Sequence, residues 1–118
     1  MNDPGPAQDL THPIPRLDTI DTELTTDRGA YIGIVIASPL IDDPLSKARL
    51  LEKVELYLSY FESPQFLKRC GEARPDRCRI YVSVHSGTDP KMLDLIDQCG
   101  ARILVKGITP VIQLTHLS

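Results

Sequence analysis

The run Tyr31-Ile-Gly-Ile-Val-Ile-Ala37 is the most apolar stretch of the chain, and it decides the fold. A near-continuous series of β-branched residues is typical of a strand that lies centrally in a sheet or is covered on both faces. Because side chains alternate along a strand, Ile32, Ile34 and Ile36 share one face. We therefore expect a central strand over residues 30–37, with a core built on these isoleucines.

The segments on either side of this strand predict a hairpin and a helix. Residues 26–29, Thr-Asp-Arg-Gly, supply turn chemistry, so a polar edge strand is expected near residues 19–25. After the central strand, Asp43 and Pro44 are typical of a helix cap and a first helical position. The helix should run to about Glu62. Its apolar stripe consists of Leu51, Val54, Leu58 and Phe61, widened by Leu50 and Tyr57.

The second half of the chain repeats the strand–helix pattern. Residues 79–85 alternate between polar and apolar, which predicts a strand with one apolar face. A cap at Asp89 begins a helix that we expect to stop at Gly100. Two further strands are expected at residues 102–105 and 111–115.

These elements predict an α+β fold in the order β-β-α-β-α-β-β. The strand–helix–strand steps favour parallel pairing, and the short-linked strand pairs favour antiparallel hairpins. The architecture is then a two-layer sandwich, in which a mixed sheet of about four or five strands lies under two helices on one face. Residues 65–76 leave two alternatives, a short turn that packs Phe66 and Leu67 or a loop, which Gly71, Pro75 and the mixed charges favour. The opposite face of the sheet is semi-polar and carries Tyr31, Val35, Tyr81, Ser83, His85 and Gln113.

Length and composition indicate one domain behind a flexible leader. The chain has 118 residues, which is the usual size of a single domain. Residues 1–17 are rich in proline and hold few large apolar groups, so we expect a disordered leader, with a short docking motif as the alternative. Residues 18–118 are then a single αβ domain.

The net charge limits the classes of partner that we expect, and the cysteine content indicates the cellular compartment. The formal net charge of −3 disfavours a general binder of nucleic acid, which usually carries a basic surplus. No apolar run is long enough to cross a membrane, and the first residues do not resemble a signal peptide. The odd cysteine count (Cys70, Cys78 and Cys99) favours a reducing cytoplasm over a secreted disulfide scaffold.

The loop from His85 to Asp89 is a candidate ligand site. It lies where a strand leads into a helix, and a helix N-terminus presents free amides to an anion. Ser86, Gly87 and Thr88 would line the site with hydroxyls and backbone amides. Histidine is a common general acid or base, so His85 could serve as one. A loop that only caps the helix is the alternative, because no P-loop lysine is present and Asp89 would repel an anion.

No catalytic residue, cofactor or metal site is predicted. Ser86 beside His85 is not a hydrolase signature, because neighbours on a strand rarely reach one another and G-x-S-x-G is absent. Cys70 and Cys78 are too far apart in the sequence for the close pairs that zinc sites prefer, although a redox-sensitive pair stays open. Cys99 lies on the apolar side of its helix and is expected to pack as a small hydrophobe.

One face of the first helix indicates a partner site. On a helical wheel, Leu56 and Tyr60 lie opposite the apolar stripe. Arg49 and Lys53 lie in line with them. An aromatic residue and a leucine beside basic residues are typical of a small protein-binding patch. Scattered exposed apolar residues, or burial under residues 64–76, are the alternatives.

The first helix also carries a family resemblance. Residues 50–63, LLEKVELYLSYFES, resemble the helix of a family of small bacterial domains of unknown function. In that family a hairpin precedes the Leu-rich helix, and a strand, a helix and a final strand follow. The layout would cover residues 18–115 and implies a bacterial αβ domain, with no activity or site residue to carry over. The proline-rich leader and the loop with Cys70 and Cys78 depart from the pattern.

Together these features favour a non-enzymatic interaction or accessory module that self-associates or binds a protein partner. The absence of a catalytic constellation and the outward face of the first helix are the main reasons. The competing hypothesis is a small-ligand or nucleotide-binding protein, or an enzyme, that uses the loop from His85 to Asp89.

Overall fold

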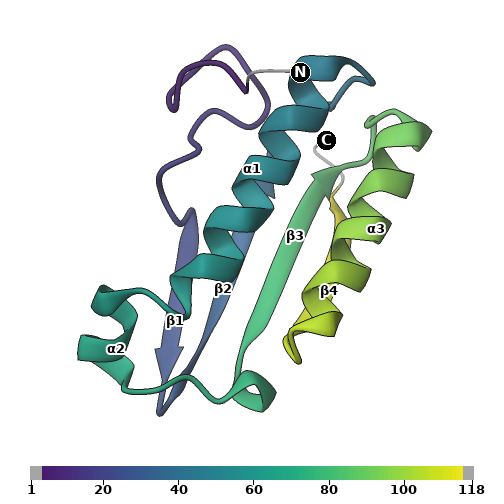
Figure 1. Cartoon of the computed structure of the whole chain (residues 1–118). Helices are drawn as coiled ribbons and strands as arrows, with labels where there is room; N and C mark the ends of the chain where they lie inside the picture. Colours follow the sequence, from purple (N-terminus) through teal and green to yellow (C-terminus); the bar gives the residue numbers. More distant parts are fainter. Residues whose placement is uncertain (1–3, 116–118) are drawn as a thin grey trace.

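The computed structural model describes residues 4–115 of the chain. Within that range it contains the following elements (Figure 1): β1 (Thr22–Thr26), β2 (Gly29–Ile36), α1 (Pro44–Tyr60), α2 (Pro64–Cys70), the 3-10 helix η1 (Pro75–Arg77), β3 (Arg79–His85), α3 (Pro90–Val105) and β4 (Thr109–Thr115). None of these described helices is long and apolar enough to cross a membrane.

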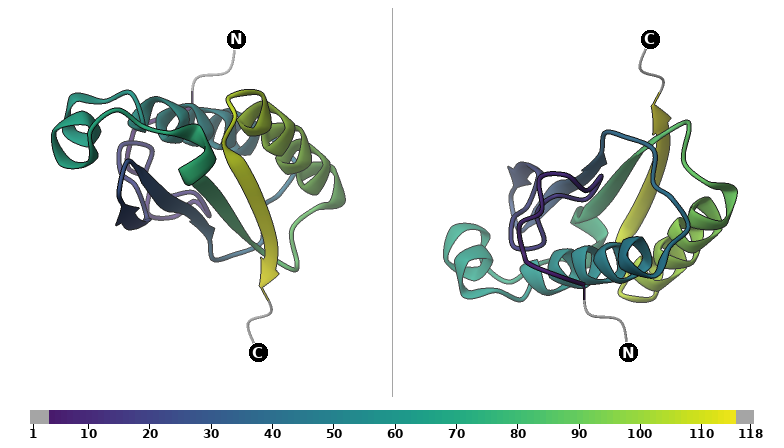
Figure 2. Two further views of the ribbon diagram at one scale, coloured as in Figure 1. Left: turned by 90° about the horizontal axis from the view of Figure 1, so that it is seen from below. Right: turned by 90° about the horizontal axis from the view of Figure 1, so that it is seen from above.

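The strands form one mixed sheet in the order β1-β2-β3-β4. β1 and β2 pair as an antiparallel hairpin, whereas β2, β3 and β4 run parallel. Helices α1 and α3 lie on the same face of the sheet, and in the described part of the chain no helix covers the opposite face (Figures 1 and 2). The predicted α+β layout, a mixed sheet with two long helices on one face, is confirmed.

The core lies between the sheet and these helices. Ile32, Ile34 and Ile36 are at most 1% exposed and point toward α1 and α3, as the alternation along the strand predicted. Their register partners on β3, which are also buried, are Ile80, Val82 and Val84. A fully buried aliphatic side chain contributes about 1.5–3 kcal/mol by its removal from water, so this double row is a main source of stability.

The N-termini of both long helices are where the sequence predicted them. The side chain of Asp43 accepts a hydrogen bond from the amide of Ser46 at 2.7 Å, and Pro44 takes the first helical position of α1. Asp89 accepts a hydrogen bond from the amide of Lys91 at 2.9 Å and caps α3 in the same way. These caps satisfy amides that have no partner inside the helix.

The prediction of a strand at residues 102–105 is wrong, because these residues form the last turn of α3. Gly100 does not stop the helix. It faces β4 so closely that an added Cβ would lie 3.3 Å from Cδ1 of Ile112. Ile103 is fully buried and extends the apolar stripe of α3, which ends near Gly107, whose φ of +80° suits glycine. The order is therefore β-β-α-α-β-α-β, and a helix rather than a hairpin turn precedes β4.

A short helix also replaces part of the loop expected at residues 65–76. The hydroxyl of Ser63 accepts a hydrogen bond from the amide of Phe66, and Pro64 takes the first position of α2. Phe66 is fully buried and packs edge-on against Phe61, with ring centroids 5.3 Å apart. The Ser-Pro pair that was expected to end α1 therefore begins α2 as well.

Residues 4–17, called the N-terminal arm below, pack along α1, where the sequence predicted a disordered leader (Figure 1). Residues 1–3 of that leader lie outside the described residues. Ile14 is 1% exposed and anchors the arm against the core. The arm is also folded on itself, since the amide of Leu17 donates to the carbonyl of Ala7 at 2.7 Å. Two buried side chains, Ile14 and Leu17, and main-chain hydrogen bonds thus hold in place a segment whose composition favours disorder.

Candidate functional site

The partner patch predicted on α1 does not form one outward face. Arg49 and Lys53 are 0% and 1% exposed, so the expectation that they lie on the surface is wrong. The arm covers the side of α1 that carries them. Leu51, which was expected in the apolar stripe, is instead 46% exposed. The helical wheel put Leu51 on the wrong side of α1, and it could not show that a distant segment covers Arg49 and Lys53.

Arg49 binds main-chain carbonyls of the arm. Its Nε donates to the carbonyl of Ile14 at 2.8 Å, and its Nη1 donates to the carbonyls of Pro4 and Pro6 at 2.9 and 2.7 Å. A buried charge is tolerated when hydrogen bonds replace its water shell. The guanidinium therefore ties the arm to α1, and it is not presented to a partner.

Lys53 has a similar role at the end of the arm. Its ammonium donates to the carbonyl of Thr19 at 2.8 Å and to that of Arg16, and it forms an ion pair with Asp21 at 2.9 Å. The second carboxylate oxygen of Asp21 accepts a hydrogen bond from the amide of Val35 at 3.0 Å. Lys53 and Asp21 thus connect α1 with the arm and the sheet.

Leu56 and Tyr60 are half-buried and line a shallow cavity of about 380 Å³ beside α2. The hydroxyl of Tyr60 donates to the carboxylate of Glu23, which also pairs with Arg69 at 2.8 Å. Burial, together with this hydrogen-bonded carboxylate, raises the pKa of Tyr60 to about 12. Leu56 and Tyr60 remain accessible in part, but without the basic neighbours that the sequence analysis assigned to them.

The loop between β3 and α3 uses its polar groups internally. Nδ1 of His85 accepts a hydrogen bond from the amide of Gly87 at 2.9 Å. Thr88 is 4% exposed, and its hydroxyl accepts a hydrogen bond from the amide of Leu40 at 3.1 Å. Ser86 is exposed. These contacts agree with the helix-capping alternative, and ligand binding by this loop stays a prediction.

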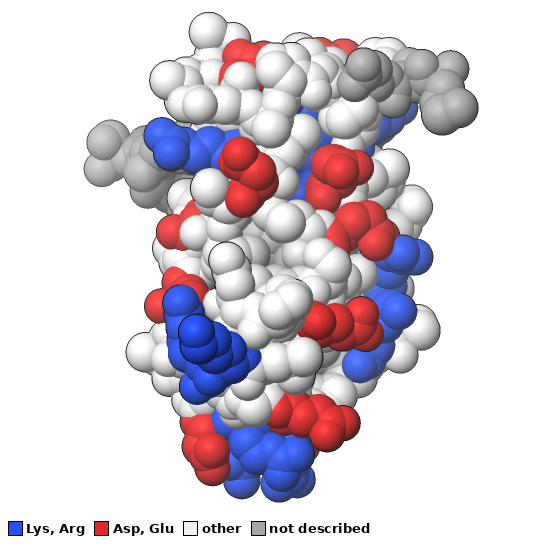
Figure 3. Space-filling model, turned by 60° about the vertical axis from the view of Figure 1, so that its left-hand side comes forward, with Lys and Arg blue, Asp and Glu red and all other residues white. Residues whose placement is uncertain are grey.

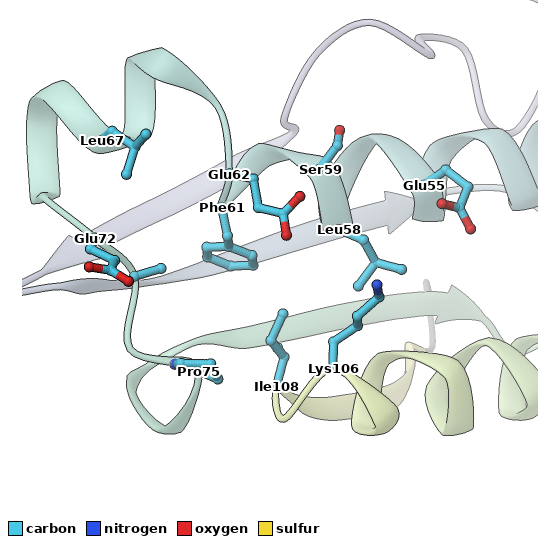
Figure 4. Close-up of a pocket in the computed structure, with 11 residues that line it drawn as sticks. Glu55, Leu58, Ser59, Phe61, Glu62, Leu67, Glu72, Pro75, Lys106 and Ile108 are labelled. Atoms are coloured by element: carbon cyan, nitrogen blue, oxygen red, sulfur yellow. The ribbon is translucent and has the colours of Figure 1, made fainter.

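A hollow of about 600 Å³ lies at the C-terminal end of α1 (Figure 4). It is bordered by α1, by α2 and the segment that follows it, and by the turn between α3 and β4. Leu58, Phe61 and Ile108 are at most 8% exposed and fix its base, whereas Leu67 is 46% exposed at its side. Ala73 and Pro75 complete the apolar lining. The volume is that of a site for a small ligand or for a few side chains of a partner.

The rim of this hollow is mainly acidic. Its charged residues are Glu55, Glu62, Glu72 and Lys106 (Figure 4). Glu55 is paired with Arg102. In residues 4–115, the carboxylates of Glu62 and Glu72 have no ion-pair partner. An apolar base therefore lies beside negative charge that the described chain leaves unneutralised.

The sequence analysis missed this hollow, because its walls come from segments that are far apart in the chain. Two of them were misassigned, since α2 was expected to be a loop and the end of α3 a strand. The available signal was the apolar pair Phe66 and Leu67 after Ser63-Pro64, which indicates a second amphipathic turn. Nothing local in the sequence shows that this turn faces Ile108.

Cys70, Cys78 and Cys99 are free thiols, and a redox-sensitive pair of Cys70 and Cys78 stays a prediction. Cys78 and Cys99 are buried, and burial raises the pKa of the Cys99 thiol to about 11. Cys99 packs in the core, as its place on the helix predicted. Within residues 4–115, no group of three His, Cys, Asp or Glu side chains comes together in a way that could hold a metal ion.

Surface charge is mixed on the side of the molecule that carries the arm and α2. In Figure 3, acidic and basic side chains alternate over this face, and no broad basic area is seen among its described residues. A phosphate backbone needs such an area for its electrostatic attraction. That the chain is no general binder of nucleic acid stays a prediction from the net charge of −3.

Comparison of the chain with protein-family models, with curated proteins and with solved structures finds no match. The resemblance of residues 50–63 to a family of small bacterial domains therefore stays a prediction. The functional inference rests on the geometry and chemistry of the site alone.

Proposed function

We propose that the chain is a non-enzymatic interaction module, and that its protein partner docks in the hollow at the C-terminal end of α1. The observation that carries this proposal is the pairing of an apolar base with the unpaired carboxylates of Glu62 and Glu72. An apolar side chain of the partner would fill the hollow, and lysine or arginine beside it would meet the rim. Apolar anchors supply most of the affinity at such sites, while charge supplies orientation and speed of association.

The proposed site is continuous with part of the face that the sequence predicted. Ser59 lines both the hollow and the shallower cavity that holds Leu56 and Tyr60. A partner that extends beyond one anchor residue would therefore cross the end of α1 and contact Leu56. This connection supports a protein segment rather than a small molecule as the ligand.

The proposal is tested with two capped peptides of equal length, one alternating leucine with lysine and the other alternating leucine with glutamate. Each is titrated into the full chain while backbone amide resonances are recorded. We expect the lysine peptide to shift the resonances of Leu67, Ala73 and Ile108, because these residues line the hollow. The glutamate peptide should leave them unchanged.

Variants distinguish this site from general attraction to an acidic protein. Glu62→Gln combined with Glu72→Gln should weaken binding of the lysine peptide about tenfold, because two charge contacts are lost. Glu52→Gln is the matched control, since Glu52 is exposed on α1 and does not line the hollow. Equal affinities for these variants, or equal shifts from both peptides, would contradict the proposal.

The loop from His85 to Thr88 remains the site of the alternative function, binding of a phosphate-bearing small ligand. No contact in the described structure favours it over helix capping. The same spectra test it, because inorganic phosphate bound there would shift the amide resonances of residues 86–91. Shifts confined to those residues, with none at the hollow, would favour the alternative.

A further inference from the structure

The strand β4 lies at one edge of the sheet, and its outer side is open. It pairs with β3, and among residues 4–115 no strand or isolated bridge pairs with its other side (Figure 1). Its residues Ile112 and Leu114 are 37% and 54% exposed. An open edge offers unpaired main-chain groups to another strand, and proteins usually protect it with charged side chains, proline or a covering segment.

The hydrogen bonds to β3 show which main-chain groups of β4 remain unpaired. The amide of Thr109 and the carbonyl of Thr115 bond to the residues that flank β3, at 3.2 and 3.0 Å. The N–H and C=O groups of a strand point to alternate sides from one residue to the next. Since Thr109 and Thr115 point toward β3, Ile112 and Leu114 point their amides and carbonyls outward. Pro110 has the same direction but no N–H to donate.

β4 lacks most of the features that protect an edge strand. Its sequence, TPVIQLT, contains no charged residue, and Pro110 protects only its beginning. The opposite edge of the sheet differs, because β1 carries Glu23, which pairs with Arg69 of α2 at 2.8 Å. β4 is therefore the edge that is suited to further pairing.

Apolar side chains border the open edge on the side of the helices. Cδ1 of Ile112 lies 3.3 Å from the position of a Cβ added at Gly100, so Ile112 faces α3. Leu114 shares this face, because side chains alternate along a strand. Leu104 lies one helical turn after Gly100 and is 61% exposed. Another strand beside β4 would therefore gain hydrogen bonds and apolar contacts together.

We propose that β4 pairs with β4 of a second copy of this chain, antiparallel about a two-fold axis at Gln113, so that the two sheets become one. Ile112 then lies opposite Leu114 of the second copy, and Leu114 lies opposite Ile112 of that copy. Both pairs consist of outward residues, so each pair exchanges two N–H···O=C bonds. Pro110 lies outside these pairs, and its missing N–H is not required.

A second copy fits this edge because the edge is complementary to itself. The outward residues Ile112 and Leu114 lie on either side of Gln113, so a two-fold rotation brings donors onto acceptors and one apolar side chain onto another. Two-fold dimers with such isologous contacts are the commonest protein oligomers. This surface is separate from the hollow, whose lining among the described residues includes none from β4, so either proposal can fail without the other.

Cysteine cross-linking tests the pairing and its register. Gln113→Cys is made in a chain that carries Cys70→Ser, because Cys70 is half-buried whereas the other two thiols are buried. Across the proposed axis the two copies of residue 113 form a pair without hydrogen bonds, with Cα atoms about 4.5 Å apart, which a disulfide can span. We expect mild oxidation to give a cross-linked dimer of twice the 13.1 kDa chain mass.

Val111→Cys in the same background is the matched control. The side chains of Val111 and Gln113 lie on the same face of the sheet, but the axis places Val111 opposite Thr115 of the second copy. The two copies of residue 111 are then four residues apart along the strands, about 13 Å, which no disulfide can span. The Gln113→Cys chain should therefore cross-link at least about tenfold faster than the Val111→Cys chain. Equal rates, or no cross-link in either chain, overturn the proposal.

The main-chain hydrogen bonds are tested by comparing Leu114→Pro with Leu114→Ala. Proline removes an outward N–H and leaves the hydrogen bonds to β3 intact, whereas alanine keeps the N–H. In sedimentation equilibrium the parent chain should approach twice the mass of one copy. Leu114→Pro should weaken this dimer at least about tenfold more than Leu114→Ala does, because each copy loses a hydrogen bond.

Two results of the sedimentation experiment overturn the proposal. One is a parent chain that keeps the mass of one copy at the highest concentration at which it stays in solution. The other is a dimer that Leu114→Pro weakens no more than Leu114→Ala does. Circular dichroism checks that both variants are folded, and if Leu114→Pro does not fold, the cross-linking rates decide.

Discussion

The two ends of α1 carry charge in opposite ways. Toward its N-terminus, Arg49 and Lys53 are buried beneath the arm and donate to main-chain carbonyls, Lys53 also pairs with Asp21, and Nη2 of Arg49 has no hydrogen-bond partner among the described residues. Beyond its C-terminus, Glu62 and Glu72 are exposed at the rim of a hollow and, among the described residues, have no ion-pair partner. The comparison shows that charged residues on a helix do not by themselves indicate a binding face. Another segment of the chain can cover them, and they then stabilise the fold and do not contact a partner.

The largest effect is expected for Lys53→Met. The substitution removes the ammonium group of a side chain that is 1% exposed, together with its hydrogen bonds to Asp21 and to the carbonyls of Thr19 and Arg16, which costs about 4 kcal/mol of unfolding free energy. Lys47→Met is the control, because Lys47 pairs with Asp42 at the surface and its side chain is 51% exposed. That change should cost less than about 1 kcal/mol. Urea denaturation measures both, and similar losses would remove the distinction between the two kinds of charge.

A slightly smaller loss is expected for Ile14→Ala in the arm. Truncation of a fully buried isoleucine removes apolar contacts and leaves a cavity, so we expect a loss of about 3 kcal/mol. Leu10→Ala tests the same arm at a residue that is 67% exposed and should change stability by less than about 0.5 kcal/mol. If the arm were disordered, both substitutions would give the same small change in a thermal or urea unfolding curve.

The arm also predicts a dependence of stability on pH through His12. Burial, and then the charge of Arg49, lower the pKa of His12 below its usual 6.5, against the opposing effect of Asp43 and Asp9. The unfolded chain therefore binds this proton at a higher pH than the native chain does. Its contribution to stability is present above pH 6.5 and is lost as the pH falls toward the native pKa.

His12→Asn should flatten the plot of unfolding free energy against pH over this range. The structural reason is that Nδ1 of His12 accepts a hydrogen bond from the amide of Ile14 at 2.9 Å, which a protonated ring cannot do. Nε2 of His12 lies 3.0 Å from the hydroxyl of Ser46. An identical slope in the variant would mean that another group causes the pH dependence.

The smallest effect on stability is expected at the hollow. Glu62→Gln changes an exposed carboxylate with no ion-pair partner among residues 4–115, so the unfolding free energy should change by less than about 0.5 kcal/mol. Thermal unfolding of the variant and the parent chain measures the difference. A loss of about 3 kcal/mol, the size expected for Ile14→Ala in the arm, would show that Glu62 serves the fold rather than a partner.

Sequence patterns predicted those helices and strands whose formation depends on residues close together in the chain. The alternation of residues 79–85 predicted β3 with the same first and last residues that the structure has, and the caps at Asp43 and Asp89 begin α1 and α3. The error at residues 102–105 arose because a short apolar run fits a strand or a helix equally well. Gly100 was taken as a helix stop, whereas its place opposite β4 depends on tertiary packing.

The candidate sites were harder to predict because they depend on contacts between distant segments. Whether Arg49 is exposed depends on the position of Pro4 and Pro6, and the composition of that segment favours disorder. The hollow beside Ile108 needs four segments to be placed correctly at once. The helical period predicted an outward face for Leu56 and Tyr60, whereas both are half-buried and pack against the core, beside α2.

The hydrogen bonds between the arm and α1 also have a consequence for the order in which the segments fold. The hydrogen bonds from Arg49 to the arm join residues 35 to 45 positions apart, with the whole β1–β2 hairpin between them. Closing so long a loop is entropically unfavourable until α1 has formed and packed on β2. We therefore expect the arm to dock last and to detach first, so that amides such as that of Leu17 exchange with solvent faster than those of the central strands. The arm, which covers the buried side chains of Arg49 and Lys53, would then detach more often than any central strand of the sheet opens.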